Sequence, residues 1–533
     1  MVSVVDCGII AGYLVLMLVV GYFSGKENKT QSDYFLAGRS MPWVPIALSV
    51  AATMISANGF IGGPGWAYTS GMYPVMVNIA VPFAVFIALS ITTPVIYRMN
   101  VTSVYEYMGK RLGKYSKALS IIQFFINSII QISSMVYIPV LILKMITGWS
   151  FYILVPLVVV TALAYTLMGG IKAVIWTDSI QMIVVVGAVF LVIYTAIRGS
   201  GLGFMDTVSM AQKAGKLNAL NFSTDITAEN TFWATLIGGS MMWIRYFCFD
   251  QAQVQRVLTS KSLKSAKNSF VVSAFVMNIV YYIMLFVGVI LFVYYKGRTF
   301  ETSNEIMISF ILNEMPVGAV GLIIAGVFAA AMSSVDSLLN SMTAVFTKDV
   351  YEPFVCTKKK EEASLKVTMI ITLVIGMIMM LVIFIGFNGT VKSILDVVGN
   401  YISYFAGPAA GIFLLAMFTY TANDLGTAAG FLAGLFGGYA VAVKCQVSWL
   451  WNPAIGATIT VVCGYVFSMI SKRKNQEEKA AEYTAMGIRK RLLEDGKHRE
   501  DGISVLPFSV GRHEAAVLLF FVLQYVVLYF IQY

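Results

Sequence analysis

Charged residues, histidine and paired cysteines are scarce in this chain. Only 12% of its 533 residues are charged and 58% are hydrophobic. This composition excludes a soluble multidomain protein and indicates a polytopic membrane protein. The two histidines, His498 and His513, both lie near the C-terminal end, so neither can form a metal site or a proton relay in the core. The five cysteines show no CxxC or disulfide spacing, so neither a bound metal nor a disulfide framework is indicated.

Enzyme motifs are also absent. The sequence has no HExxH, no GxSxG and no nucleophile paired with a histidine, so we do not expect an enzyme. The net charge of +10 does not indicate a nucleic-acid partner, because the basic residues lie in short loops between apolar segments. The apolar N-terminal stretch lacks a basic start and a cleavage site, and we interpret it as a retained helix.

Apolar segments of membrane-spanning length recur along the chain and predict an all-α integral membrane protein with about 14 transmembrane helices in a lipid bilayer. The predicted spans are residues 4–24, 43–71, 73–97, 117–146, 151–169, 174–198, 231–250, 268–295, 317–347, 366–387, 393–418, 424–443, 449–471 and 513–531. Lys and Arg gather on alternate connections, namely 25–42, 98–116, 251–267, 348–365 and 472–512. Basic connections of membrane proteins lie on the cytoplasmic side, which places both termini on the opposite side. We therefore predict a multi-pass protein of the cell (plasma) membrane whose termini are both extracellular or periplasmic.

The span at 317–347 has polar side chains in its second half. Ser333, Asp336, Ser337 and Asn340 recur at spacings of three and four, so they share one helix face. A carboxylate at membrane depth is costly unless it meets a cation, a partner or water. Hydroxyls and a carboxylate suit a small hard cation. The alternative is a helix–helix seam held by Ser and Asn hydrogen bonds.

Two spans contain helix-breaking residues. SANGFIGGPGW at 56–66 has four glycines and a proline, and the span at 231–250 contains Gly238–Gly239, Arg245 and Asp250. Corresponding interruptions five spans apart indicate an inverted repeat with a midplane site. The alternative is that these glycines allow close helix packing. Asp178, just inside another span, either faces water at the boundary or belongs to a cation pathway.

Four long stretches carry a resemblance to known proteins: DYFLAGRSMPWVPIALSVAATMISANGFIG at 33–62, MGGIKAVIWTDSIQ at 168–181, FDQAQVQR at 249–256 and FAAAMSSVDSLLNSMTAVFTKDVY at 328–351. They resemble the sodium:solute symporter family, including its iodide, multivitamin and monocarboxylate branch and its bacterial sugar and sialic-acid members. The resemblance implies a single transporter domain, residues 1–533, with the leucine-transporter-like (amino acid-polyamine-organocation) fold. It comprises two inverted five-helix repeats, 43–198 and 231–418, whose first helices are broken. The helices 4–24, 424–471 and 513–531 are then peripheral, and 472–512 is a cytoplasmic loop.

The resemblance also implies an ion site. A family Na⁺ site falls on Ala52, Ile55, Ala330, Ser333 and Ser334, where carbonyls of an unwound helix and two hydroxyls supply oxygen ligands. A second Na⁺ site of some members falls on Asp178, Ser333, Asp336 and Ser337. Here the chain departs from the sialic-acid pattern, which has Ser at the position of Asp336. The extra carboxylate could strengthen ion binding, bind a proton or pair with a basic residue.

The substrate cavity implied by the resemblance is lined by residues from several spans. They are Ser56, Gly59, Phe60, Asn78, Gln131, Trp243, Arg245, Tyr246, Phe247, Gly399, Asn400 and, as a gate, Tyr404. Gly59, Asn78 and Gln131 stand where sugar or sialic-acid members have Gln, Glu and Arg. Arg245 suits a carboxylate; the alternative is internal pairing with Asp336 or Asp178, since Asp250 is five residues on and a poor partner in an α-helix.

These features predict a Na⁺-coupled secondary active symporter that imports a small polar or anionic organic solute, a carboxylate or a sugar, by alternating access. The alternatives are an H⁺-coupled symporter and a Na⁺/sugar symporter, including one for sialic acid. From other classes, a channel-like facilitator or a transport-derived sensor could keep the same scaffold.

Overall fold

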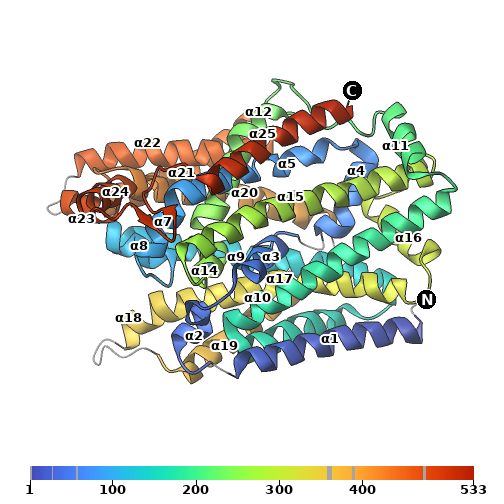
Figure 1. The fold of residues 1–533 in the computed structure, drawn as a ribbon, viewed down its shortest axis with the longest axis horizontal. Helices are drawn as coiled ribbons and strands as arrows, with labels where there is room; N and C mark the ends of the chain where they lie inside the picture. Colours follow the sequence, from blue (N-terminus) through green and yellow to red (C-terminus); the bar gives the residue numbers. More distant parts are fainter. Residues whose placement is uncertain are drawn as a thin grey trace.

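The computed structural model describes residues 3–26, 28–55, 58–356, 363–386, 391–471 and 476–532. Helices make up nearly all of this part, and most of them lie side by side along one direction (Figure 1). Ten helices among the described residues are long and apolar enough to cross a membrane. The all-α membrane architecture predicted from the apolar segments is confirmed, while the full number of 14 spans stays a prediction.

The long helices follow the predicted spans closely. Their bounds are α1 Val4–Gly25, α9 Lys114–Thr147, α10 Phe151–Ser200, α15 Leu263–Tyr294, α17 Ala319–Val345, α19 Leu365–Gly386, α20 Val391–Phe418, α21 Asp424–Cys445, α22 Asn452–Ile470 and α25 Arg512–Gln532. Helix α10 contains two predicted spans with no loop between them. The chain turns instead at Gly170, whose φ of +56° favours glycine and where a Cβ would meet the Tyr34 carbonyl oxygen at 2.5 Å.

The predicted span 43–71 is divided, but not where the glycines are densest. Helix α3 (Trp43–Ala52) ends before them, and the chain resumes as η2 (Asn58–Gly62) and α4 (Gly63–Ser70). Gly65 therefore lies inside a helix, where a Cβ would meet the Ser303 carbonyl oxygen at 2.1 Å. This glycine permits close packing, and the unwound segment directly follows Ala52.

The predicted span 231–250 is a continuous helical run of α12 (Phe232–Ala234), η5 (Thr235–Gly239), α13 (Ser240–Ile244) and η6 (Arg245–Phe249). It does not break at Gly238–Gly239. A Cβ on Gly238 would meet the Leu450 carbonyl oxygen at 1.8 Å, so the close-packing alternative holds at this glycine. The break comes at Asp250, which has extended backbone and caps α14 (Gln251–Leu258).

Shorter elements complete the described chain. They are α2 Gln31–Leu36, η1 Ala37–Arg39, η3 Tyr73–Val75, α5 Met76–Ile79, α6 Val81–Ile87, η4 Ala88–Thr92, α7 Thr93–Arg98, α8 Val104–Arg111, α11 Phe204–Lys213, α16 Ser303–Glu314, η7 Phe346–Tyr351, α18 Glu352–Val355, η8 Trp449–Trp451, α23 Gln476–Tyr483, α24 Ala485–Glu494, β1 Arg499–Glu500 and β2 Ile503–Ser504. The segment 476–511 folds against α8, where the Tyr107 hydroxyl donates to the Tyr483 carbonyl oxygen at 3.2 Å.

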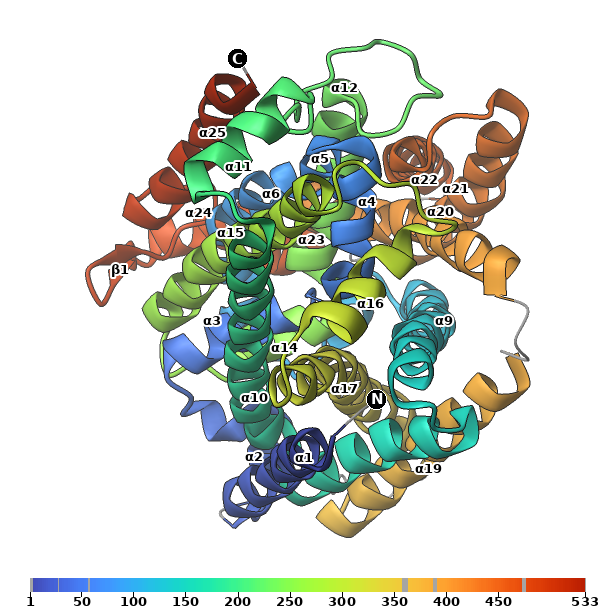
Figure 2. The same ribbon diagram turned by 90° about the vertical axis from the view of Figure 1, so that its right-hand side faces the viewer.

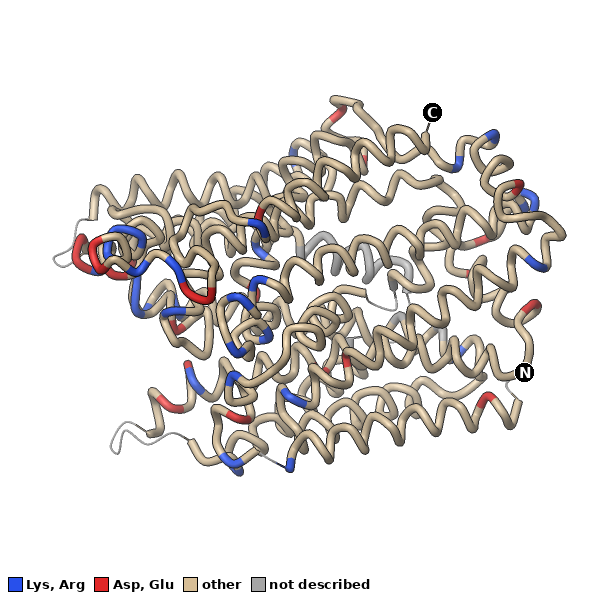
Figure 3. The backbone as a smooth tube through the Cα atoms, in the orientation of Figure 1, with Lys and Arg blue, Asp and Glu red and all other residues tan. Residues whose placement is uncertain are grey.

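Helix α17 occupies the centre of the fold. Figure 2, which looks along the helices, shows it among α1, α9, α10 and α19, and nearly all of its side chains are buried. Lys and Arg gather at one end of the molecule, and both termini lie toward the other end (Figure 3). The predicted orientation of the termini across a membrane stays a prediction.

Candidate ion and substrate sites

Helices α3 and α17 meet at the residues predicted for the first Na⁺ site. The Ser333 hydroxyl lies 3.5 Å from the Ala52 carbonyl oxygen and 3.2 Å from that of Ala330. The Ser334 hydroxyl also lies 3.2 Å from the Ala330 carbonyl oxygen. Ile55 follows in the turn after α3, where its N–H donates to the Ala52 carbonyl. Because α3 ends at Ala52, the Ala52 carbonyl accepts from the Ile55 N–H of a tight turn rather than from a continuing helix, and its second lone pair faces the Ser333 hydroxyl.

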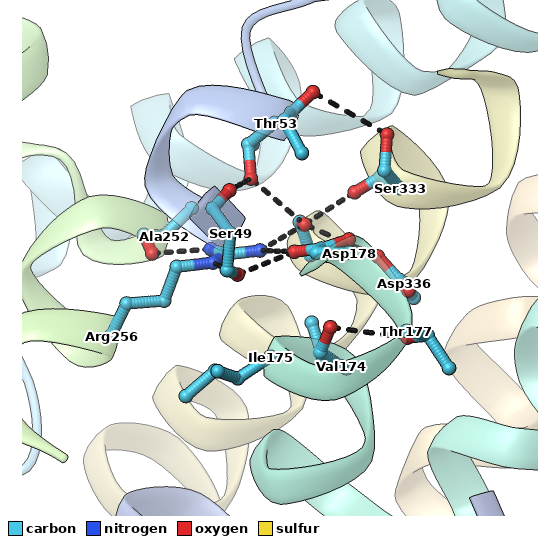
Figure 4. Close-up of polar contacts among 12 residues, drawn as sticks. Ser49, Thr53, Val174, Ile175, Thr177, Asp178, Ala252, Arg256, Ser333 and Asp336 are labelled. Atoms are coloured by element: carbon cyan, nitrogen blue, oxygen red, sulfur yellow. Dashed lines mark hydrogen bonds and ion pairs between the residues drawn. The ribbon is translucent and has the colours of Figure 1, made fainter. Parts of the chain in front are cut away.

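A buried arginine, Arg256, lies beside this junction. Its Nη2 lies 3.1 Å from Asp178 Oδ2, its Nε donates to Ser49 Oγ at 2.7 Å, and its Nη1 donates to the Ala252 carbonyl at 2.6 Å. Nη2 also donates to the Ser337 hydroxyl. Figure 4 shows the guanidinium beside Ser49, Asp178 and Ala252. The Ser49 hydroxyl donates to the same Asp178 oxygen at 2.5 Å, so the ion pair is embedded in hydrogen bonds.

Arg256 falls in the basic connection predicted at 251–267, and treating it there as a solvent-exposed loop cation was wrong. The side chain is 0% exposed, as is that of Asp178, which rules out a boundary carboxylate facing water. The sequence did carry a usable signal. Asp250 is an N-cap residue, and the helix that it starts, α14, places Arg256 in the buried interior between the spans.

Asp336 faces a different set of partners. The Tyr165 hydroxyl of α10 donates to Asp336 Oδ2 at 2.5 Å, and the Ser337 hydroxyl lies 3.2 Å from Oδ1. Among the described residues, no Lys or Arg forms an ion pair with Asp336. The residues predicted for a second ion site are thus brought together, but Arg256 already contacts Asp178 and Ser337.

The remaining polar residue of this face, Asn340, belongs to a helix seam. Its Oδ1 accepts a hydrogen bond from Gln255 Nε2 at 2.8 Å, and Gln255 also donates to the Phe35 carbonyl at 2.9 Å. The seam alternative therefore accounts for Asn340, whereas Ser333 lies at the α3 junction.

A cavity of about 290 Å³ lies next to the end of α3. Six of the predicted substrate residues line it: Gly59, Asn78, Gln131, Trp243, Arg245 and Tyr246. The other lining residues are Met54, Ile55, Val77, Met242, Met277, Tyr281, Met284, Ser403, Ala406 and Trp449. Sequence reasoning missed the methionines, which look like ordinary apolar residues of a span until the cavity is seen.

Other predicted substrate residues lie elsewhere. Phe60 is buried next to Gly326. Phe247 lines a separate apolar pocket and packs edge-on against Phe270, and Tyr404 packs edge-on against Tyr439. Ser56 lies outside the described residues, as do the side-chain environments of Gly399 and Asn400.

Arg245 pairs with Asp250, at 3.3 Å between Nη1 and Oδ2. Treating Asp250 as a poor partner was wrong, and neither Asp336 nor Asp178 is the partner. The reason is local: residues 245–249 form a π-helical turn, in which positions five apart come onto one face. The Nε of Arg245 is buried and has no hydrogen-bond partner in the described structure.

Comparisons with known proteins show the family. Residues 34–434 match the sodium:solute symporter family. The chain belongs to this family. It is 29% identical over 477 residues to the sodium/sialic acid symporter SiaT of Proteus mirabilis, covering 87% of this chain and 94% of SiaT. It is 30% identical over 446 residues to mouse sodium-coupled monocarboxylate transporter 1, covering 80% and 71% of the two chains.

Two solved transporter structures are similar to this chain in fold. An outward-open, substrate-bound Na⁺-coupled sialic acid symporter superimposes with a TM-score of 0.80 at 26% identity, covering 88% of this chain and 98% of that one. The nucleobase-cation-symport-1 transporter Mhp1, at 15% identity and a TM-score of 0.54, shares the fold. This symporter therefore has the leucine-transporter-like fold. It is a Na⁺-coupled solute transporter rather than an enzyme, with Na⁺ as a co-substrate.

The Arg256–Asp178 pair yields a stability prediction. Arg256→Gln leaves Asp178 buried without its cation, and we expect a loss of about 3–5 kcal/mol, measured as a lower melting temperature of the purified protein. The double variant Arg256→Gln/Asp178→Asn should recover most of this loss, because the unpaired charge is gone. Lys444→Gln, on an exposed residue at the end of α21, is the matched control. Additive losses in the double variant would contradict the pairing.

Proposed function

We propose that this symporter imports a small organic anion with an apolar part, driven by Na⁺ held between α3 and α17. One observation carries the proposal: the end of α3 and the short segment after it contribute both to the proposed Na⁺ site and to the wall of the cavity. Ala52 and Ile55 are proposed Na⁺ ligands, and Met54 and Ile55 line the cavity. An ion that fixes this turn also fixes part of the cavity wall, which is the physical requirement for coupling two ligands.

The proposed ligands of this Na⁺ are the carbonyl oxygens of Ala52, Ile55 and Ala330 and the hydroxyls of Ser333 and Ser334. All of these residues are buried, so the ion exchanges water for protein oxygens as it binds. None of the ligands is charged, so binding is moderate and the ion can leave on the other side of the membrane. Half-unwound helices supply carbonyls to Na⁺ in the same way in other transporters.

Removing either hydroxyl tests this assignment. We expect Ser333→Ala and Ser334→Ala each to raise the Na⁺ concentration for half-maximal uptake by about tenfold, since each loses a ligand to a charged group. Uptake is measured in proteoliposomes over a range of Na⁺ concentrations. Ser341→Ala is the control, because Ser341 is buried on the same helix and donates only to the Ser337 carbonyl, at 2.9 Å. Unchanged Na⁺ dependence in both variants would rule the site out.

We propose a second Na⁺ position at Asp178, Ser333, Asp336 and Ser337. When both are ionised, Asp178 and Asp336 place two negative charges at 0% exposure, and Arg256 neutralises one of them. A net buried charge is costly at membrane depth and favours a mobile cation. Asp178 Oδ1 has no hydrogen-bond partner among the described residues, which leaves it available as a ligand.

The stoichiometry of transport distinguishes one ion from two. We expect two Na⁺ to enter with each solute molecule, measured as the ratio of radioactive Na⁺ uptake to solute uptake in the same vesicles. Asp336→Asn should lower the ratio to one, because the net buried charge that favours the second ion is removed. Tyr165→Phe keeps the carboxylate and should keep the ratio of two. A wild-type ratio of one would contradict the second site.

The substrate class follows from the walls of the cavity. Four methionines and several aromatic side chains provide apolar surface, while Asn78, Gln131 and Ser403 offer hydrogen bonds. Asp250 pairs with Nη1 of Arg245. The buried Nε of Arg245 has no partner among the described residues, which leaves it for a ligand. A guanidinium edge binds a carboxylate with paired, charge-assisted hydrogen bonds. Relatives named for sialic acid and for monocarboxylates also take acidic solutes.

Arg245→Gln tests the recognition of an anion. We expect it to abolish uptake of carboxylate substrates while the shift of melting temperature by Na⁺ persists, because the Na⁺ ligands are not altered. Asp250→Asn is the companion variant: it keeps an N-cap side chain and removes the internal partner. If Arg245 serves only that ion pair, the two variants will impair uptake equally and the double variant will restore it.

The finer architecture is part of the proposal. We assign residues 43–198 and 231–418 as two inverted repeats, with breaks after Ala52 and at Asp250, within about 14 spans of the cell membrane. The concentration of Lys and Arg at the end opposite both termini supports a cytoplasmic basic end (Figure 3).

A further inference from the structure

A second, wholly apolar cavity is lined by residues of α9, α17, η7 and α19. Its volume is about 480 Å³, and its walls are hydrophobic side chains such as Ile126, Phe346 and Val374. In Figure 2, α17 lies near the centre, with α9 and α19 beside it on the right. Ile122, Ile126, Ile370, Val374 and Ile378 are each more than 40% exposed, so the groove is open toward the surface.

We infer that this groove binds one acyl chain of an anionic phospholipid from the leaflet at the basic end of the molecule. In a membrane-spanning protein, an exposed apolar face at this depth meets lipid rather than water. The length of the groove indicates a single acyl chain, and the basic residues at its mouth indicate an anionic headgroup.

The length of the groove matches one leaflet. Its walls run from Ile121 to Ile129 on α9 and from Ile370 to Met379 on α19. At 1.5 Å per residue these stretches are about 12 and 14 Å long. One leaflet supplies about 15 Å of hydrocarbon, half of a core of about 30 Å. A single acyl chain lying along the helices therefore fits the groove from end to end.

Basic side chains mark the mouth of the groove. Lys366 lies one helical turn before Ile370, on the stripe that continues to Val374, and Lys117 lies one turn before Ile121. Lys117 is already paired with Asp349, at 2.7 Å. Lys366 is exposed and forms no ion pair within the described part of the chain. A free ammonium at the headgroup level attracts an anionic headgroup and contributes about 1 kcal/mol.

The site touches the ion-binding helix. Met342 of α17 and Phe346 of the following η7 form one wall of the groove, and Phe346 contacts Phe125 of α9 with ring centroids 6.2 Å apart. An acyl chain in the groove therefore packs against the helix that also carries Ser333 and Ser334. Lipid binding is nevertheless independent of the proposed transport function, and it can be measured without Na⁺ or solute.

The test compares lipids with identical chains on the purified, delipidated full-length protein. Phosphatidylglycerol is expected to raise the melting temperature more than phosphatidylcholine and to be retained more often in native mass spectra. Lys366→Gln should weaken phosphatidylglycerol binding about fivefold and leave phosphatidylcholine unchanged. Lys444→Gln, an exposed lysine on α21, is the control for charge alone.

A filling variant tests the groove itself. Val374→Trp, at a position 48% exposed, should displace the acyl chain and abolish binding of both lipids. Ile183→Trp, on the exposed face of α10 and outside the groove, should bind as the wild type does. Ile378→Trp repeats the test if Val374→Trp does not yield a monodisperse protein. Wild-type binding in the filling variants, or equal binding of both lipids by the wild type, would overturn the inference. So would a hydrocarbon without a headgroup that binds as tightly as phosphatidylglycerol.

Discussion

The buried guanidinium of Arg256 is the interaction on which the centre of this protein depends. It joins side chains of α3, α10 and α17 to its own helix α14, through Ser49, Asp178 and Ser337. A charged group with no exposure is tolerated only when it is paired and its hydrogen bonds are satisfied. The four helices can therefore rearrange only by moves that keep Arg256 paired or that supply another cation. This constraint suits a protein that binds cations at the same junction.

Two helix breaks place this arginine and the cavity relative to each other. The end of α3 at Ala52 provides carbonyls beside Ser333, and the break at Asp250 starts the helix that carries Arg256. Asp250 also pairs with Arg245 at the cavity. One short segment, residues 245–256, therefore connects the wall of the cavity to the ion pair of the core. Both breaks are local backbone features, and together they bring the ion junction and the cavity wall next to each other.

The sequence predicted much of the fold and less of the site, for physical reasons. Span length is set by bilayer thickness, so apolar stretches could be read directly, and α17 was recognised from its polar face. Glycine was misleading, because Gly65 and Gly238 serve close packing with Ser303 and Leu450 rather than unwinding. Arg256 was misplaced since a count of loop charges cannot tell a solvated cation from one turned inward by an N-cap. The Arg245–Asp250 pair required a π turn, which spacing rules for α-helices do not anticipate.

The position of Ile55 has a consequence for the order of binding. Its carbonyl is a proposed Na⁺ ligand and its side chain lines the cavity, so a single turn of backbone is shared by two ligands. If Na⁺ orders this turn, a solute arriving afterwards meets a wall that is already formed and has less conformational entropy to lose. Linkage then requires the solute to tighten Na⁺ binding by the same factor. Coupling in this geometry needs no direct contact between ion and solute, so relatives with different cavity walls can keep one ion site and carry different solutes.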